Sequence, residues 1–129
     1  MAYSIEELKT QAKYTIDRVA ERSRLRYITP GSGQSQVYKE KGEEATDFIA
    51  AGYPNDLSSY PFIQAEVNAT GKTRQQVADD IIAAKSVTVA VLAAIEQSRL
   101  SGKKNVDDAV DIDDINSAKD ATVASLELI

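Results

Sequence analysis

Apolar residues recur every three or four positions through most of the chain, which is the spacing of amphipathic helices. The first such face is formed by Ile5, Leu8, Ala12, Ile16, Val19, Ala20, Ser23 and Tyr27. Ser4 and Glu7 form a capping box that begins this helix, and Pro30 disfavours helical geometry in the residue before it. The pattern predicts a helix over about residues 4–28 and a loop over residues 30–34.

Two shorter helices are predicted in the middle of the chain. One covers about residues 35–51 and ends at Gly52, because glycine readily takes the left-handed conformation that often follows a helix. The other covers residues 61–70, begins with a proline at the favoured first position, and ends at Gly71. The segment between them, residues 53–61, is rich in turn-forming residues and predicts a connector.

The longest helix is predicted over about residues 73–100. Thr73 and Gln76 form a second capping box at its start. Its apolar positions follow a heptad-like spacing: Val77, Ile81, Ala84, Thr88, Val91 and Ile95. Further apolar residues widen this seam, and a helix that is apolar on so much of its circumference is usually central in a bundle. The polar, glycine-containing segment 101–104 is expected to break the helix.

A final helix is predicted over about residues 112–128. Asp111 is its expected cap, and acids in its first turn suit the positive end of the helix dipole. The preceding segment, residues 106–113, fits either a short helix capped by Asn105 or an extended piece of chain.

These elements predict an all-α fold, a small helical bundle with two long helices, two short bridging helices and a C-terminal helix. The expected division is a helical bundle domain at residues 1–104 and an acidic C-terminal helical segment at residues 105–129. That segment packs either on the same domain or on a neighbouring subunit.

The composition narrows the chemistry that the chain can perform. The 129 residues include no histidine and no cysteine, which removes the commonest general base, disulfides and most transition-metal ligand sets. We therefore expect no enzyme, no catalytic, cofactor-binding or metal-binding residues, and no cofactor.

The net charge of −5 is unevenly distributed. Residues 106–129 hold seven acids and one base, a net charge of −6, so residues 1–105 carry a net charge of +1. An acidic surface argues against nucleic-acid and anionic-membrane partners. No apolar stretch reaches membrane-spanning length, and the N-terminus does not have the pattern of a signal peptide.

Three short motifs resemble ligand sites but have simpler interpretations. Residues 71–73, Gly-Lys-Thr, match the end of a phosphate-binding loop, but the glycine that this motif requires is Glu66 here. Residues 31–33, Gly-Ser-Gly, are too short for a dinucleotide fingerprint. The acidic segment from Asp107 to Asp114 does not contain the glycine that a calcium-binding loop requires. It favours a solvated helix start. The alternative is an acidic patch for a basic partner or a loosely held divalent ion.

Paired acids and clustered aromatics are the remaining candidates. Asp79–Asp80 and Glu43–Glu44 are neighbours in helices and point about 100° apart, which favours polar helix faces over a catalytic pair. Five aromatics gather in the middle third: Tyr38, Phe48, Tyr53, Tyr60 and Phe62. They favour a packed core, with an exposed anchor surface for a partner as the alternative.

Four motifs carry a resemblance to a known family. They are Tyr38-x-x-Lys41-x-x-Glu44-Ala45-x-x-Phe48, Tyr60-Pro61-x-x-x-Ala65-Glu66, Thr70-Gly71-x-Thr73-x-x-x-Val77-Ala78-x-x-Ile81 and Ile95-Glu96-x-x-Arg99. Together with the upstream helix containing Arg18 to Arg26 and the turn at residues 28–31, they resemble a small helical domain of tail-fibre and other tail-associated proteins of double-stranded DNA bacteriophages. The acidic final segment departs from this pattern.

The resemblance implies a structural virion protein of a tailed bacteriophage, which connects or decorates the tail fibre, baseplate or neck through helix packing. Its expected partners are other virion proteins and, because virion parts are usually symmetric, further copies of itself as a homo-oligomer. Its expected location is the virion, and the host cytoplasm during assembly. The alternative is a tail-fibre assembly chaperone that is absent from the mature particle.

Overall fold

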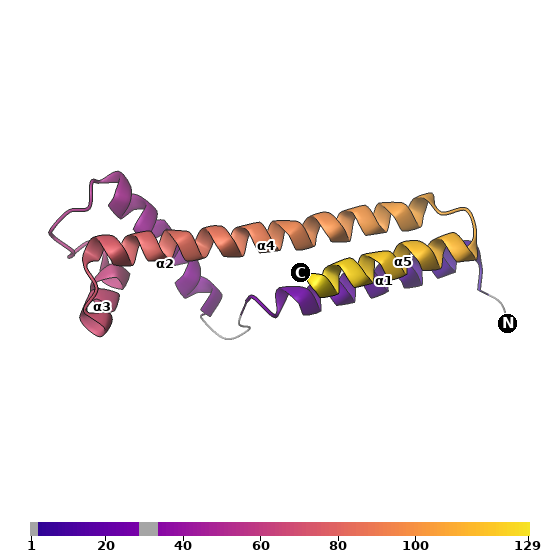
Figure 1. The fold of residues 1–129 in the computed structure, drawn as a ribbon, viewed down its shortest axis with the longest axis horizontal. Helices are drawn as coiled ribbons and strands as arrows, with labels where there is room; N and C mark the ends of the chain where they lie inside the picture. The colour runs from indigo at the N-terminus through magenta and orange to yellow at the C-terminus, as the bar shows by residue number, and fades with distance from the viewer. Residues whose placement is uncertain (1–2, 29–33) are drawn as a thin grey trace. The chain divides into compact units, whose positions relative to one another are not determined.

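A computed structural model of the chain describes residues 3–28 and 34–129, and all its regular elements in these ranges are helices. They are α1 (Ile5–Arg24), α2 (Gln34–Ala50), α3 (Pro61–Thr70), α4 (Arg74–Asp108) and α5 (Ile112–Leu128) (Figure 1). The predicted all-α fold, with two long helices, two shorter ones and a C-terminal helix, is confirmed. The chain forms two compact units: unit 1 is residues 1–28 and 90–129, and unit 2 is residues 29–89.

The predicted helix starts are confirmed by their caps. The backbone N–H of Glu7 donates to Ser4 Oγ at 3.1 Å. Thr73 and Gln76 bond reciprocally, each backbone N–H reaching the other side chain at 3.1 Å. Asp111 Oδ1 accepts the backbone N–H three residues later at 2.8 Å. Local capping chemistry therefore begins α1, α4 and α5 where the sequence predicts.

Unit 1 is a bundle of α1, α5 and residues 90–108 of α4, which lie side by side (Figure 1). Ser23 Oγ donates to the carbonyl of Leu126 at one end, at 3.0 Å, and Lys9 Nζ donates to the carbonyl of Asp107 at the other, at 2.7 Å. Helices α1 and α5 are therefore parallel, and α4 is antiparallel to both. The buried apolar core consists of Ala12, Ile16, Val19, Ala20, Ile95, Val106, Ala109, Ile115 and Leu126.

Unit 2 contains α2, α3 and residues 74–89 of α4. Its buried core is small: Phe48, Ile63, Val77 and Ala78. The ring of Phe48 meets the rings of Tyr53 and Tyr60 edge to face, at centroid distances of 5.7 and 4.9 Å. Helix α2 ends as predicted, with Gly52 in the left-handed region at φ 84°.

The predicted break at residues 101–104 is wrong, because α4 continues through it to Asp108. Gly102 lies inside the helix and is buried. A Cβ atom at this position would lie 2.3 Å from Cγ2 and Oγ1 of Thr122 on α5, closer than real atoms approach. The glycine therefore serves the close approach of α5 and does not end α4. Residues 106–108, left open by the sequence, are the last turn of α4.

The first helix ends four residues earlier than predicted, at Arg24. Residues 25–28 form turns in which the N–H groups of Arg26 and Tyr27 bond the carbonyls three residues before them. These turns aim side chains at the C-terminus of α5: Arg26 Nη2 donates to the carbonyl of Leu126 at 3.0 Å, and the Tyr27 hydroxyl donates to the carbonyl of Ile129. Last-turn carbonyls of α5, which have no partner within that helix, are satisfied in this way.

The expectation that the longest helix is central in a bundle is also wrong. In unit 2 the α4 core residues are Val77 and Ala78, whereas Ala83, Ala84, Val87 and Val89 are exposed. In unit 1 the buried apolar residues of α4 are Ile95 and Val106, whereas Ala90, Ala93 and Ala94 are exposed. Each small core covers only the side of α4 that faces it, so much apolar surface stays in contact with solvent.

Residues 30–33 of the predicted loop lie outside the described residues, and Gln34 is the first residue of α2. In the described ranges, none of the helices combines the length and the apolarity that a membrane crossing requires.

We predict that Gly102→Ala lowers the free energy of unfolding by about 1–3 kcal/mol, because the new methyl group overlaps Thr122 in a packed interior. Urea unfolding followed by circular dichroism measures this change. Gly42→Ala is the matched control: its Cβ would meet only the flexible end of Lys85, at 2.9 Å, so this substitution is expected to be neutral or to stabilise by up to about 1 kcal/mol.

Combining Gly102→Ala with Thr122→Ala should recover part of the loss, since the two closest atoms of Thr122 are then absent. If Gly102→Ala changes the free energy of unfolding no more than Gly42→Ala does, the close-approach interpretation is contradicted.

Candidate functional site

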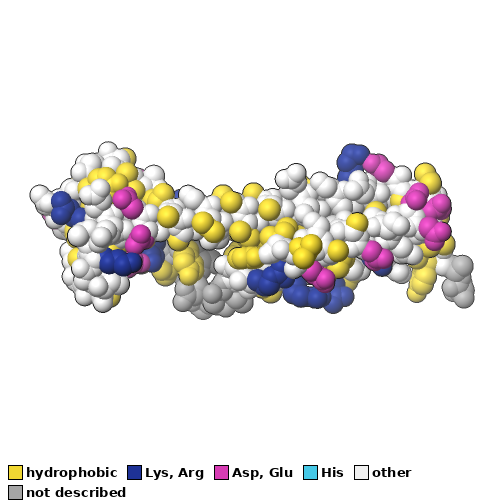
Figure 2. All heavy atoms as spheres, in the orientation of Figure 1, with side chains coloured by type: hydrophobic (Ala, Val, Ile, Leu, Met, Phe, Trp, Pro, Cys, Tyr) yellow, Lys and Arg dark blue, Asp and Glu magenta, His cyan; other side chains and the backbone are white. Residues whose placement is uncertain are grey.

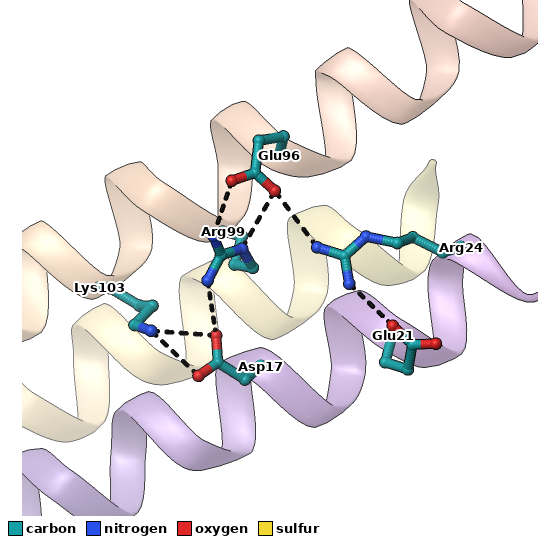
Figure 3. Close-up of polar contacts among 6 residues, drawn as sticks. All are labelled: Asp17, Glu21, Arg24, Glu96, Arg99 and Lys103. Carbon is teal, nitrogen blue, oxygen red and sulfur yellow. Dashed lines mark hydrogen bonds and ion pairs between the residues drawn. The ribbon is translucent and has the colours of Figure 1, made fainter.

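The most extensive polar cluster in unit 1 joins α1 to α4 (Figure 3). Arg99 Nη1 donates to Asp17 Oδ1 at 3.0 Å, and Lys103 Nζ donates to the two oxygens of the same carboxylate at 3.2 and 3.0 Å. Asp17 thus accepts three charged hydrogen bonds from two consecutive turns of α4. Charge-assisted bonds of this kind are stronger than neutral ones, so they fix the register of the two helices.

Glu96 extends the cluster by one turn of α4. Its carboxylate accepts two bonds from Arg99, at 3.1 and 2.7 Å, and one from Arg24 Nη2 at 3.2 Å. Arg24 also donates to Glu21 on its own helix at 2.9 Å. Three acids and three bases therefore form one network with no net charge, which we call the α1–α4 network.

Hydrogen bonds in the α1–α4 network favour the charged forms of Asp17, Glu96 and Arg99. Burial raises the pKa of Asp17, but hydrogen bonds from Lys103 and Arg99 outweigh it and bring the pKa below 3.8, the ordinary value. The hydrogen bond from Arg99 lowers the pKa of Glu96, and the bonds to Glu96 and Asp17 raise the pKa of Arg99. Shifts in these directions stabilise ion pairs, whereas a general base for neutral pH needs a raised carboxylate pKa. The role of the network is therefore to hold α1 and α4 in position relative to each other.

Sequence reasoning did not identify the α1–α4 network. The visible signal was the opposite-charge pair Glu96 and Arg99, three residues apart on a helix and part of a motif already singled out. Asp17 gives no such signal, because its partners are more than eighty positions away.

In unit 2 a carboxylate of α2 caps α3. Tyr60 precedes α3 and makes no side-chain cap bond. Instead, Glu44 accepts the backbone N–H groups of Phe62 and Ile63, at 3.2 and 2.7 Å. These are N–H groups that a helix cannot satisfy internally, and the negative charge suits the helix dipole. Glu44 therefore holds α3 against α2.

A cavity of about 300 Å³ lies beside this cap. Its lining is formed by Glu40, Glu43, Glu44, Asp47, Ser59, Tyr60 and Phe62. Four carboxylates make this hollow negative. In the described ranges, however, no three acidic side chains are placed to hold a metal ion.

The phosphate-loop-like motif at residues 71–73 has the capping roles favoured by the sequence. Gly71 ends α3 in the left-handed region at φ 73°, Thr73 caps α4, and Lys72 Nζ bonds Asp80 at 3.0 Å. The other glycine motif, residues 31–33, lies outside the described residues.

Three of the acids between residues 107 and 114 have separate partners, and Asp113 and Asp114 lie in the first turn of α5. Asp107 bonds Lys13 at 2.8 Å, Asp108 bonds Lys104 at 2.5 Å, and Asp111 caps α5. The bond from Lys13 lowers the pKa of Asp107. These acids serve helix ends and surface ion pairs, as the simpler interpretation predicts.

The paired acids also bond to different groups. The Tyr53 hydroxyl donates to Asp79 at 2.7 Å, which raises the pKa of that tyrosine, and Asp80 meets Lys72. The aromatic cluster is mainly core: Phe48 is fully buried with Tyr53 and Tyr60 packed on it, whereas Tyr38 is 63% exposed.

Helix α4 carries exposed apolar side chains over several turns. Between Ile81 and Ile95 the only charged residue is Lys85. Val87 and Val89 of unit 2 are 65% and 55% exposed. Figure 2 shows hydrophobic side chains along the visible face of this helix. Exposed apolar surface of this kind marks sites of association.

No protein-family model matches this chain, and searches of curated proteins and of solved structures find no match either. The resemblance to phage tail-associated proteins therefore rests on the sequence motifs alone.

We predict that Asp17→Asn lowers the free energy of unfolding at pH 7 by about 1 kcal/mol, the upper end for partly exposed ion pairs. Because folding lowers the pKa of Asp17, the wild-type advantage is complete above pH about 5 and disappears as the pH falls through the carboxylate range. Urea unfolding at several pH values between 7 and 3 measures both effects.

Asp120→Asn is the control, since Asp120 is exposed and lies 3.4 Å from Lys119 alone. A difference between wild type and Asp17→Asn that stays constant over this pH range would contradict the role given to the carboxylate charge.

We predict that Glu44→Ala destabilises unit 2 by about 1–2 kcal/mol, the range for losing a helix N-cap. Glu44→Gln should lose less, because its amide oxygen still accepts one N–H. Amide hydrogen exchange in α3 measures the effect, with Glu43→Ala as the neighbouring control. Equal exchange in the Glu43 and Glu44 variants would contradict the cap.

Proposed function

We propose that this chain is a structural protein of a tailed-bacteriophage virion, which connects or decorates the tail fibre, baseplate or neck by helix packing. The sequence motifs that resemble tail-associated proteins suggest the setting. The observation that carries the mode of action is the exposed apolar surface of α4, because a helix with one charge in fifteen residues gains stability by covering that surface with another protein.

The proposed partner for α4 is the same helix of further copies, in a homo-oligomer. Four exposed apolar residues support this, because they recur at intervals of four, three and four, the spacing of helices that associate along their length: Ala83, Val87, Ala90 and Ala94. Lys85 is the only charge in this stretch, so like-charge repulsion between copies is small there.

We predict that the wild-type chain associates with increasing concentration, and that Val87→Lys with Val89→Lys abolishes association through α4 while leaving helical content unchanged. Both valines are mostly exposed, so the substitutions introduce charge without emptying a core. Sedimentation equilibrium at high salt measures the mass, because apolar association persists when charges are screened. Ala69→Lys, exposed on α3, is the control.

A wild-type chain that remains monomeric at high salt across the accessible concentrations would contradict the oligomer. Virion membership is tested separately, by mass spectrometry of purified particles from cells that express this chain. Its presence in stoichiometric amount supports the structural role, whereas its presence in infected lysate but not in particles supports the assembly chaperone.

A further inference from the structure

One exposed face of α1 combines apolar and cationic side chains. Tyr14, Arg18, Arg22 and Leu25 follow one another at intervals of four, four and three residues, and all four are exposed. The guanidinium carbon of Arg18 lies 5.8 Å from the centroid of the Tyr14 ring, a cation–π contact. We call this set the α1 face.

The α1 face has the composition of an interface without a partner in its own unit. Tyr14 is 63% and Leu25 46% exposed. Among the described residues of unit 1, Arg18 and Arg22 form no ion pair, whereas the neighbouring Arg24 meets two carboxylates. Tyrosine and arginine are enriched at protein interfaces, where their apolar parts are buried and their polar ends are paired.

Acidic side chains, opposite in charge to the arginines of the α1 face, lie at the α4–α5 turn of the same unit. Val110 is 79% exposed and Ile112 50%, and they stand beside Asp113 and Asp114. No ion pair to these two acids occurs within the described part of unit 1. Figure 2 shows acidic side chains at this end and basic side chains along the lower edge of the unit.

The two surfaces of one chain are too far apart to meet. Because α1 and α5 are parallel and Ser23 lies at the level of Leu126, Asp113 lies near the level of Thr10. At 1.5 Å per residue, Arg18 is about 12 Å further along the bundle and Arg22 about 18 Å. These separations exceed the screening length of about 8 Å at physiological salt. The charges of the two surfaces therefore do not pair within one chain, and a second copy offers each of them its complement.

We propose that the α1 face binds the α4–α5 turn of a second copy of this chain. Val110 and Ile112 pack against Tyr14, and Asp113 and Asp114 pair with Arg18 and Arg22, which follow Tyr14 along the same face. Each surface has apolar side chains beside charged ones, and the charges of the two surfaces are opposite in sign, as in protein interfaces that combine apolar burial with paired polar groups. Each copy carries both surfaces, so the contact is head-to-tail and extends into a ring or a filament.

This contact is distinct from the one proposed for α4 and does not depend on it. The experiment therefore uses the full chain carrying Val87→Lys and Val89→Lys, in which association through α4 is removed. This parent chain is expected to associate at low salt and to dissociate as salt is raised. Light scattering on a size-exclusion column measures its mass.

Charge reversal at either surface should abolish this association. Arg18→Glu with Arg22→Glu leaves both surfaces acidic, and Asp113→Lys with Asp114→Lys leaves both basic, so each variant repels itself. An equimolar mixture of the two variants restores complementary pairs at both contacts and should recover the mass of the parent. Lys39→Glu with Lys72→Glu is the control, since it changes the net charge equally at exposed residues outside the α1 face.

A parent that stays monomeric at low salt, an unchanged mass in either reversed variant, or a mixture that stays monomeric would overturn the proposal. Lysines at Asp113 and Asp114 lie in the first turn of α5 and weaken its dipole interaction, so folding is checked by circular dichroism. Val110→Lys, in the turn outside both helices, is the second variant. By itself, the Val110→Lys variant should not associate. Mixed with the Arg18→Glu, Arg22→Glu variant, it should associate again, and failure in either experiment counts against the proposal.

Discussion

The absence of a side chain at Gly102 determines how unit 1 is built. Thr122 occupies the space that a Cβ atom of residue 102 would need, so α4 and α5 approach more closely than two ordinary side chains allow. The approach buries Thr122 and brings Ile115 and Leu126 of α5 into the core shared with α1. It also places the carbonyl of Leu126 beside Ser23 and Arg26, which both donate hydrogen bonds to it. One methyl-sized space therefore sets the position of the whole C-terminal helix.

Polar contacts then select one arrangement among those that the apolar core permits. A core of alanine, valine and isoleucine tolerates small sliding movements of helices, because its side chains are similar in size and carry no directional bonds. The α1–α4 network removes this freedom, since Asp17 must meet both Arg99 and Lys103. Unit 2 uses the same principle on a smaller scale, where Glu44 fixes the start of α3.

The sequence predicted features that depend on neighbours along the chain. The caps at Ser4, Thr73 and Asp111 satisfy N–H groups three residues away, and both α3 and α5 occupy the predicted ranges. The errors at residues 25–28 and at Gly102 share a physical cause, because each depends on α5 packing alongside. The residues around a glycine do not show whether it ends a helix or allows a neighbouring helix to pack closely against it.

The polar sites were missed for the same reason. Glu44 was interpreted as half of an acidic pair, and Asp17 was not singled out, because their partners belong to other helices. The burial of α4 was overestimated for a different reason. The spacing of apolar residues shows that a helix has an apolar side, but it does not show whether the rest of the chain has enough residues to cover that side. The described residues of unit 2 include only five fully buried apolar side chains, which leave part of its share of α4 exposed: Ala45, Phe48, Ile63, Val77 and Ala78.

This shortage of covering residues links the fold to its proposed use. Small domains bury a lower fraction of their surface than large ones, so a chain divided into two small units leaves more apolar surface exposed than one unit of the same length. Covering that surface with another helix makes association more favourable. Leaving it in contact with solvent makes the isolated chain less stable. The two effects have one origin. Under the proposed function, the exposed valines of α4 supply the surface for association, and the charged groups proposed to pair between copies would set its direction.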